Sequence, residues 1–147
     1  MTQSGKTVIE KSGGAVERPA AGPSTALKGK RILVVDDNPI NLDIASETLL
    51  SSGAEVDIAA GGEEALKYLE NTKYDLVLLD LTMPGIDGLT VGRAIRSSQI
   101  NGETVVLLFT ASDAGDAKRA VNEINAQGIV SKPVDIDVLL KNVSKYA

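Results

Sequence analysis

Three carboxylates, one hydroxyl group and one ammonium group each follow a short apolar run of this chain. In chain order, residues 32–35 precede Asp36 and Asp37, residues 76–79 precede Asp80, residues 105–109 precede Thr110, and residues 129–130 lie just before Lys132. If the runs are parallel strands, their carboxyl ends share one edge of a sheet, where open α/β sheets place their sites. The five side chains would then meet in one crevice and could carry out phosphoryl chemistry.

Asp80 is the candidate nucleophile, because a carboxylate can attack phosphorus and form an acyl phosphate. Lys132 could neutralise the gathering oxygens, and the hydroxyl of Thr110 could donate to one of them. Taken singly, the three residues have ordinary interpretations: a turn residue for Asp80, a solvated side chain for Lys132 and a helix cap for Thr110. Their shared position at strand ends favours a common site.

Asp36 and Asp37 are adjacent, so in a strand their side chains would point to opposite faces. At least one of them must leave strand geometry to reach the crevice. A cluster of Asp36, Asp37 and Asp80 without His or Cys suits a hard cation held by oxygens, and Mg²⁺ is the best candidate. Without a cation the carboxylates repel one another, which raises pKa values. The alternative is that the Asp pair only caps the following helix.

Strands and helices alternate from residue 28 onward, which predicts a (βα)₅ unit with a parallel sheet. The expected strands lie at about 31–35, 56–58, 75–79, 104–109 and 129–131. Asn38 and Pro39 are typical of a helix start, Gly53 of a helix end, and Asp135 of the start of the last helix. The apolar positions of the first helix keep helical spacing up to Gly53: Ile40, Leu42, Ile44, Ala45 and Leu49.

The composition excludes several classes of protein. The chain has 147 residues, enough for one domain with a core, and it has neither Cys nor His. Disulfides, thiol catalysis, zinc thiolate sites and imidazole chemistry are therefore excluded. No apolar stretch approaches the roughly 18 residues that span a bilayer, and no secretory signal is present. We therefore expect a cytoplasmic protein that makes no membrane contact.

Charge and composition distinguish an N-terminal tail from a single folded domain. Residues 1–30 have a net charge of +3, whereas residues 31–147 have a net charge of −8. An acidic body is a poor binder of nucleic acid, so we expect no nucleic-acid partner. Residues 1–27 are rich in Gly, Pro and Ser and lack apolar periodicity, which predicts a flexible N-terminal tail before a single domain at 28–147.

Four segments of the chain resemble the receiver domain of two-component response regulators. They are VVDDN at 34–38, DLTMPGIDG at 80–88, TA at 110–111 and KP at 132–133, and the resemblance covers about residues 29–146. It implies a flavodoxin-like, doubly wound fold whose five parallel strands have the order 2-1-3-4-5. It also implies a monomer.

The resemblance assigns a role to each metal-site residue. Asp37 and Asp80 would ligate Mg²⁺ directly, together with the backbone carbonyl of Thr82. Asp36 would contribute through water. Asp80 would accept the phosphoryl group from a phosphohistidine of a sensor histidine kinase, in cis or in trans, and a histidine phosphotransfer protein could take part in the relay.

The same resemblance gives Lys132 and Thr110 a part in signalling. Lys132 would pair with Asp80 and then with its phosphoryl group, Thr110 would move to bond a phosphoryl oxygen, and Pro133 would follow a cis peptide bond. The domain would thus catalyse its own phosphorylation and dephosphorylation and switch conformation, without being a conventional enzyme. Ile129 stands where the family often has a switch aromatic, so movement of the segment after Thr110 is expected to carry the signal.

The sequence leaves other functions to compare with a phosphoaccepting receiver. No output domain is expected in this chain. The segment NPIN at 38–41 and the tail with its Pro, Ala and Gly residues resemble the receivers of hybrid kinases, which favours a hybrid-kinase receiver over a free single-domain regulator. A receiver-shaped interaction module that is never phosphorylated is the alternative. A flavin protein would need a phosphate-binding loop where the Asp pair lies. A phosphatase with two Asp residues two positions apart would need Asp where Asn38 stands.

Overall fold

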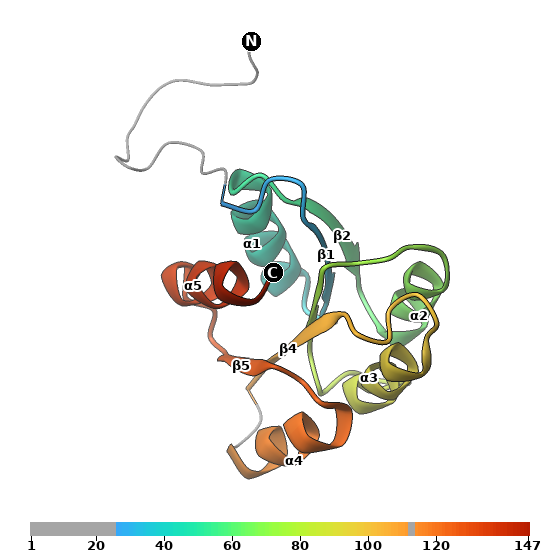
Figure 1. Ribbon diagram of the computed structural model, residues 1–147. Helices are drawn as coiled ribbons and strands as arrows, with labels where there is room; N and C mark the ends of the chain where they lie inside the picture. Colours follow the sequence, from blue (N-terminus) through green and yellow to red (C-terminus); the bar gives the residue numbers. More distant parts are fainter. Residues whose placement is uncertain (1–25, 112–113) are drawn as a thin grey trace, which may run out of the picture.

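The computed structural model of the chain describes residues 26–111 and 114–147, which form one five-stranded parallel sheet with helices on both faces (Figure 1). The strands are β1 (Arg31–Val35), β2 (Glu55–Ala59), β3 (Leu76–Leu79), β4 (Val105–Thr110) and β5 (Gly128–Ser131). The helices are α1 (Pro39–Ser51), α2 (Gly62–Asn71), α3 (Gly88–Ser97), α4 (Ala114–Ile124) and α5 (Ile136–Tyr146). The strand order β2-β1-β3-β4-β5 confirms the predicted doubly wound fold.

The predicted tail, residues 1–27, lies outside the described residues except for Ala26 and Leu27. Leu27 is buried, and its backbone N–H donates to the carbonyl of Ser52 at 2.9 Å. Leu27, the last residue of the predicted tail, therefore packs with the domain. In the described part of the chain, no helix is both long enough and apolar enough to cross a bilayer.

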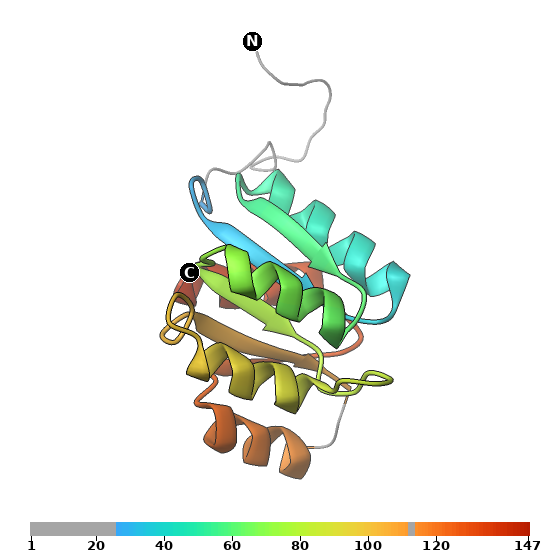
Figure 2. The same ribbon diagram turned by 90° about the vertical axis from the view of Figure 1, so that its right-hand side faces the viewer.

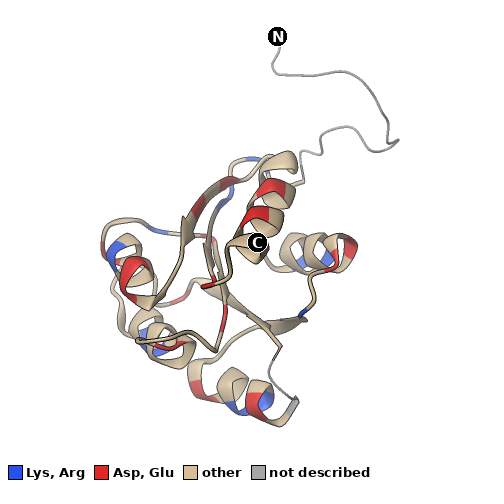
Figure 3. Ribbon diagram, turned by 180° about the vertical axis from the view of Figure 1, so that it is seen from behind, with Lys and Arg blue, Asp and Glu red and all other residues tan. Residues whose placement is uncertain are grey.

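The helices form two layers around the sheet. One layer holds α1 and α5, and the other holds α2, α3 and α4 (Figures 1 and 2). Successive residues of the central strands contribute to the two apolar clusters in turn, so that Leu33 packs toward α2 and α3 while Val34 packs toward α1 and α5. Strands covered on both faces need continuous apolar runs. Accordingly, Figure 3 shows no charged residue in β3 or β4.

The register of the strands sets the positions of the polar residues that follow them. Val35 of β1 pairs with Leu79 of β3, and Leu79 pairs with Leu108 of β4. The ladder continues beyond β3, since the N–H of Asp80 donates to the Val35 carbonyl at 2.9 Å. The carboxyl ends of neighbouring strands are therefore level, as the sequence predicts.

Local signals fix where α1 begins and ends. The side chain of Asn38 accepts from the N–H groups of Ile40 and Asn41 at 2.8 and 3.3 Å, and Pro39 occupies the first helical position. Gly53, with φ of +95°, follows the last turn in the left-handed conformation that glycine tolerates. The predicted cap and stop of this helix are both confirmed.

Ile40 keeps the helical spacing of α1 but lies outside the core. Its side chain is 67% exposed, whereas Leu42, Ala45 and Leu49 of the same helix are buried. Ile40 lies in the first turn of α1, at the carboxyl edge of the sheet, where little of the sheet lies beneath the helix. Helical spacing alone does not distinguish this turn from the next ones.

Candidate functional site

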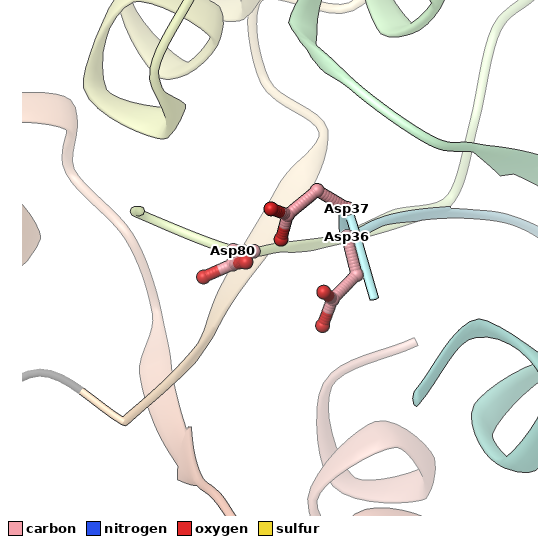
Figure 4. A group of neighbouring side chains, drawn as sticks. All are labelled: Asp36, Asp37 and Asp80. Carbon is pink, nitrogen blue, oxygen red and sulfur yellow. The ribbon is translucent and has the colours of Figure 1, made fainter. Parts of the chain in front are cut away.

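Three carboxylates gather at the carboxyl edge of the sheet. One oxygen each from Asp36, Asp37 and Asp80 lies within 4.8 Å of the others. Asp36 and Asp80 are buried, whereas Asp37 is exposed. In Figure 4 the carboxylate of Asp37 is turned toward Asp80, while Asp36 points to the other side of its own backbone. β1 ends at Val35, and both carboxylates of the adjacent pair reach the cluster.

Lys132 places its ammonium group between two of these carboxylates. Its Nζ lies 2.7 Å from Oδ2 of Asp36 and 3.3 Å from Oδ2 of Asp80. Oδ1 of Asp36 accepts from the Asn38 N–H at 2.9 Å. Among the described residues, Oδ2 of Asp36 is the only buried side-chain oxygen without an aligned hydrogen-bond donor, so the ammonium of Lys132 compensates its charge. The peptide bond between Lys132 and Pro133 is cis, as predicted.

The environment of Asp80 favours its protonated form. Burial raises the pKa of Asp80 from 3.8 to about 6, and the nearby charge of Asp36 acts in the same direction. The hydrogen bond from the Thr82 N–H and the ammonium of Lys132 oppose this rise in pKa. Asp80 is therefore ionised at neutral pH, but its ionised form is less favoured than that of an ordinary aspartate.

Gly88 and Asp87, to which the sequence patterns assign no role, shape the loop after Asp80. A Cβ on Gly88 would lie 2.1 Å from the carbonyl oxygen of Asp80, so only glycine fits this position. Oδ1 of Asp87 accepts from the Thr90 N–H at 2.9 Å and caps α3. An Asp directly before a helical pattern is a known capping signal and could have identified Asp87. The close approach of Gly88 has no such signal.

A cleft of about 410 Å³ opens above the carboxylates. Its walls are formed by Asp37, Asn38, Asn41, Asp80, Thr82, Ala111 and Lys132. Thr110 ends β4 and is buried, and its carbonyl accepts from the Lys132 N–H at 3.1 Å. The structure therefore brings Asp36, Asp37, Asp80, Thr82 and Lys132 together, with Thr110 adjacent to the cleft but not part of its wall.

The donor set of the cleft fits a hard divalent cation. Its three carboxylates offer only oxygen, and the exposed Asp37 leaves the cluster open to water. Mg²⁺ prefers such sites, because it uses one or two carboxylates and keeps several waters. Burial is the main cause of the raised pKa of Asp80, and the nearby charge of Asp36, which a cation would neutralise, adds to it.

Comparison with known proteins gives one consistent family. The profile of the response regulator receiver domain matches residues 32–144. The sensor protein GacS of Pseudomonas syringae pv. syringae is 33% identical over 132 residues, which cover 88% of this chain and 15% of that protein. The chain thus spans less than a fifth of that relative.

Solved structures of similar fold include two close matches. The chemotaxis protein CheY4 of Vibrio cholerae has a TM-score of 0.76 and 29% identity, over 80% of this chain and 98% of that one. The receiver domain of the sensor histidine kinase PA1611 from Pseudomonas aeruginosa, solved with a magnesium ion coordinated in its active site cleft, has a TM-score of 0.74 and 26% identity. That match covers 80% of this chain and 97% of that one.

Proposed function

The chain belongs to the response regulator receiver domain family of two-component systems, and we propose that Asp80 is its phosphoacceptor. The observation that carries this proposal is the pairing of a buried carboxylate with Lys132 at the carboxyl edge of the sheet, 3.3 Å apart. Two further carboxylates and an open cleft lie beside this pair.

One carboxylate oxygen of Asp80 attacks the phosphorus of a phosphohistidine. The new O–P bond forms as the P–N bond breaks, and the electron pair of that bond stays on the imidazole nitrogen, which binds a proton. In the metal-free site burial raises the pKa of Asp80 to about 6, so the carboxylate is still ionised at neutral pH. The ammonium of Lys132 pairs with the Asp80 carboxylate before transfer and with the phosphoryl oxygens after it.

Asp37 and Asp80 would hold Mg²⁺ directly, with the backbone carbonyl of Thr82, and Asp36 would contribute through water. The oxygen-only donor set supports this assignment, as does the magnesium in the cleft of the PA1611 receiver domain. When bound, the ion neutralises the negative charge that builds up as phosphoryl oxygens approach the carboxylates. Thr110 then bonds a phosphoryl oxygen, and the segment after it carries the change to a partner.

The phosphodonor in this proposal is a sensor histidine kinase, in cis or in trans, and a histidine phosphotransfer protein is a further partner. The similarity to GacS, a sensor protein, supports this choice. The domain acts as a monomer in the cytoplasm and does not bind nucleic acid, consistent with its net charge of −8 over residues 31–147.

Phosphoryl uptake from a small donor tests the proposal. The chain is incubated with acetyl phosphate and Mg²⁺, and its intact mass is measured before and after treatment with hydroxylamine, which cleaves acyl phosphates. We expect one phosphoryl group on the wild type and on the exposed control Asp43→Asn, and none on Asp80→Asn or after chelation of the metal. Uptake by Asp80→Asn at another residue would overturn the assignment.

A further inference from the structure

The ammonium group of Lys132 lies over an aromatic ring. Its Nζ is 5.0 Å from the centroid of Phe109, within the range of a cation–π contact. We propose that Phe109 is a positioning residue, whose ring holds the Lys132 ammonium in the site while Asp80 changes from a carboxylate to an acyl phosphate. This inference rests on the proposed function, because it concerns the same transfer.

The ring of Phe109 is a fixed part of the site. It is completely buried in β4, in the apolar cluster beneath α1 and α5. Phe109 pairs in register with Val130 of β5, two residues before Lys132, and the backbone of Lys132 is itself bonded to β4 through the Thr110 carbonyl. The pairing of β4 and β5 thus fixes the position of the ring relative to the backbone of Lys132.

Phosphorylation changes one of the three contacts of the ammonium. Before transfer, Lys132 is paired with Asp36 at 2.7 Å and with Asp80 at 3.3 Å. After transfer, one oxygen of Asp80 is bonded to phosphorus, and the charge that Lys132 must neutralise lies on the phosphoryl oxygens.

Phe109 suits this change because the attraction between its ring and the ammonium acts over the whole ring face. An ammonium can turn above a ring without losing the contact, whereas a hydrogen bond to one oxygen must break. The side chain of Lys132 is only 14% exposed, so water screens the contact little. Without the ring, the attraction of the buried Asp36 would dominate and hold the ammonium away from the incoming phosphoryl group.

The composition of the chain allows a test without a cavity-forming mutation. Phe109 is the only phenylalanine, so growth on mono-, di- or trifluorophenylalanine changes this ring alone. Each fluorine withdraws electron density from the ring face and weakens cation attraction at nearly constant size. The other cation–π pair of the described residues uses Tyr146 and is untouched.

Two measurements are made across the fluorine series. The first is the rate of phosphoryl uptake on Asp80 from acetyl phosphate with Mg²⁺. We expect the rate to fall with every added fluorine, by a total between about twofold and about thirtyfold, the range of cation–π strengths. The second is urea unfolding without metal, for the chain with Lys132 and for Lys132→Met. A double-mutant cycle isolates the contact, so the fluorines should lower stability only where Lys132 is present.

The outcomes separate this inference from the proposed function. A rate that is independent of fluorine number, in a chain that still phosphorylates on Asp80, would make Phe109 a packing residue only and overturn the inference. Equal loss of stability with Lys132 and with Lys132→Met would also overturn it. A fall in the uptake rate, together with a loss of stability that occurs only where Lys132 is present, supports it. Absence of uptake on Asp80 in the unmodified chain would instead refute the proposed function, while the stability cycle still tests the contact.

Discussion

Replacing the candidate phosphoacceptor should stabilise the metal-free protein. Asp80 is only 3% exposed, and burial raises its pKa from 3.8 to about 6. Because the folded chain then binds the proton more tightly than the unfolded chain, stability from this group is fully present below pH 3.8 and is lost as the pH rises through about 6. At about 1.36 kcal/mol per pKa unit, ionised Asp80 costs about 3 kcal/mol near neutral pH.

Asp80→Asn keeps the shape of the side chain and removes this cost. Urea unfolding with a chelator, followed by circular dichroism because the chain has no Trp, should show the variant more stable by about 2–3 kcal/mol near neutral pH. The difference should shrink toward zero below about pH 4. Asp43→Asn, an exposed control on α1, should change stability by less than about 0.5 kcal/mol. A destabilised Asp80→Asn at neutral pH would contradict this prediction, because Lys132 would then more than offset the burial of the carboxylate.

Two further substitutions test how the site is positioned. Gly88→Ala should lower the free energy of unfolding by about 3 kcal/mol, since its Cβ would overlap the Asp80 carbonyl. The matched Gly85→Ala, which has φ of +77° and open space, should cost about 1 kcal/mol in the same urea experiment, and equal losses would contradict the role given to Gly88. Arg96 donates to four backbone carbonyls at the end of α4 and before β4, so Arg96→Lys should cost about 2 kcal/mol by thermal unfolding. A thermal midpoint unchanged in Arg96→Lys would show that these bonds add little.

The fold and most of the site could be predicted because they depend on patterns along the chain. The polar residues follow buried runs, and the register of parallel strands makes their ends level. Such a pattern can be recognised in the sequence without knowing how the side chains pack. Asn38 was predictable as a cap for the same reason, since a cap uses only neighbouring backbone groups.

The remaining features depend on contacts between distant segments. The ring of Phe109 reads as one more apolar residue of a strand, and only packing shows that Lys132 lies above it. The tight fit of Gly88 against Asp80 follows from the path of the loop between them. Ile40 keeps the spacing of a core residue, but its turn lies at the edge of the sheet and leaves it exposed.

The most direct test of the central claim is an amide proton–nitrogen NMR spectrum with Mg²⁺, recorded before and after addition of beryllofluoride, which mimics a phosphoryl group on aspartate. We expect large shifts at Asp80, Thr82, Ala111 and Lys132 that spread into α4 and β5, and no such shifts in Asp80→Asn. Shifts with Mg²⁺ alone and none with beryllofluoride would contradict the central claim, because the cleft would then hold a metal without a phosphoacceptor.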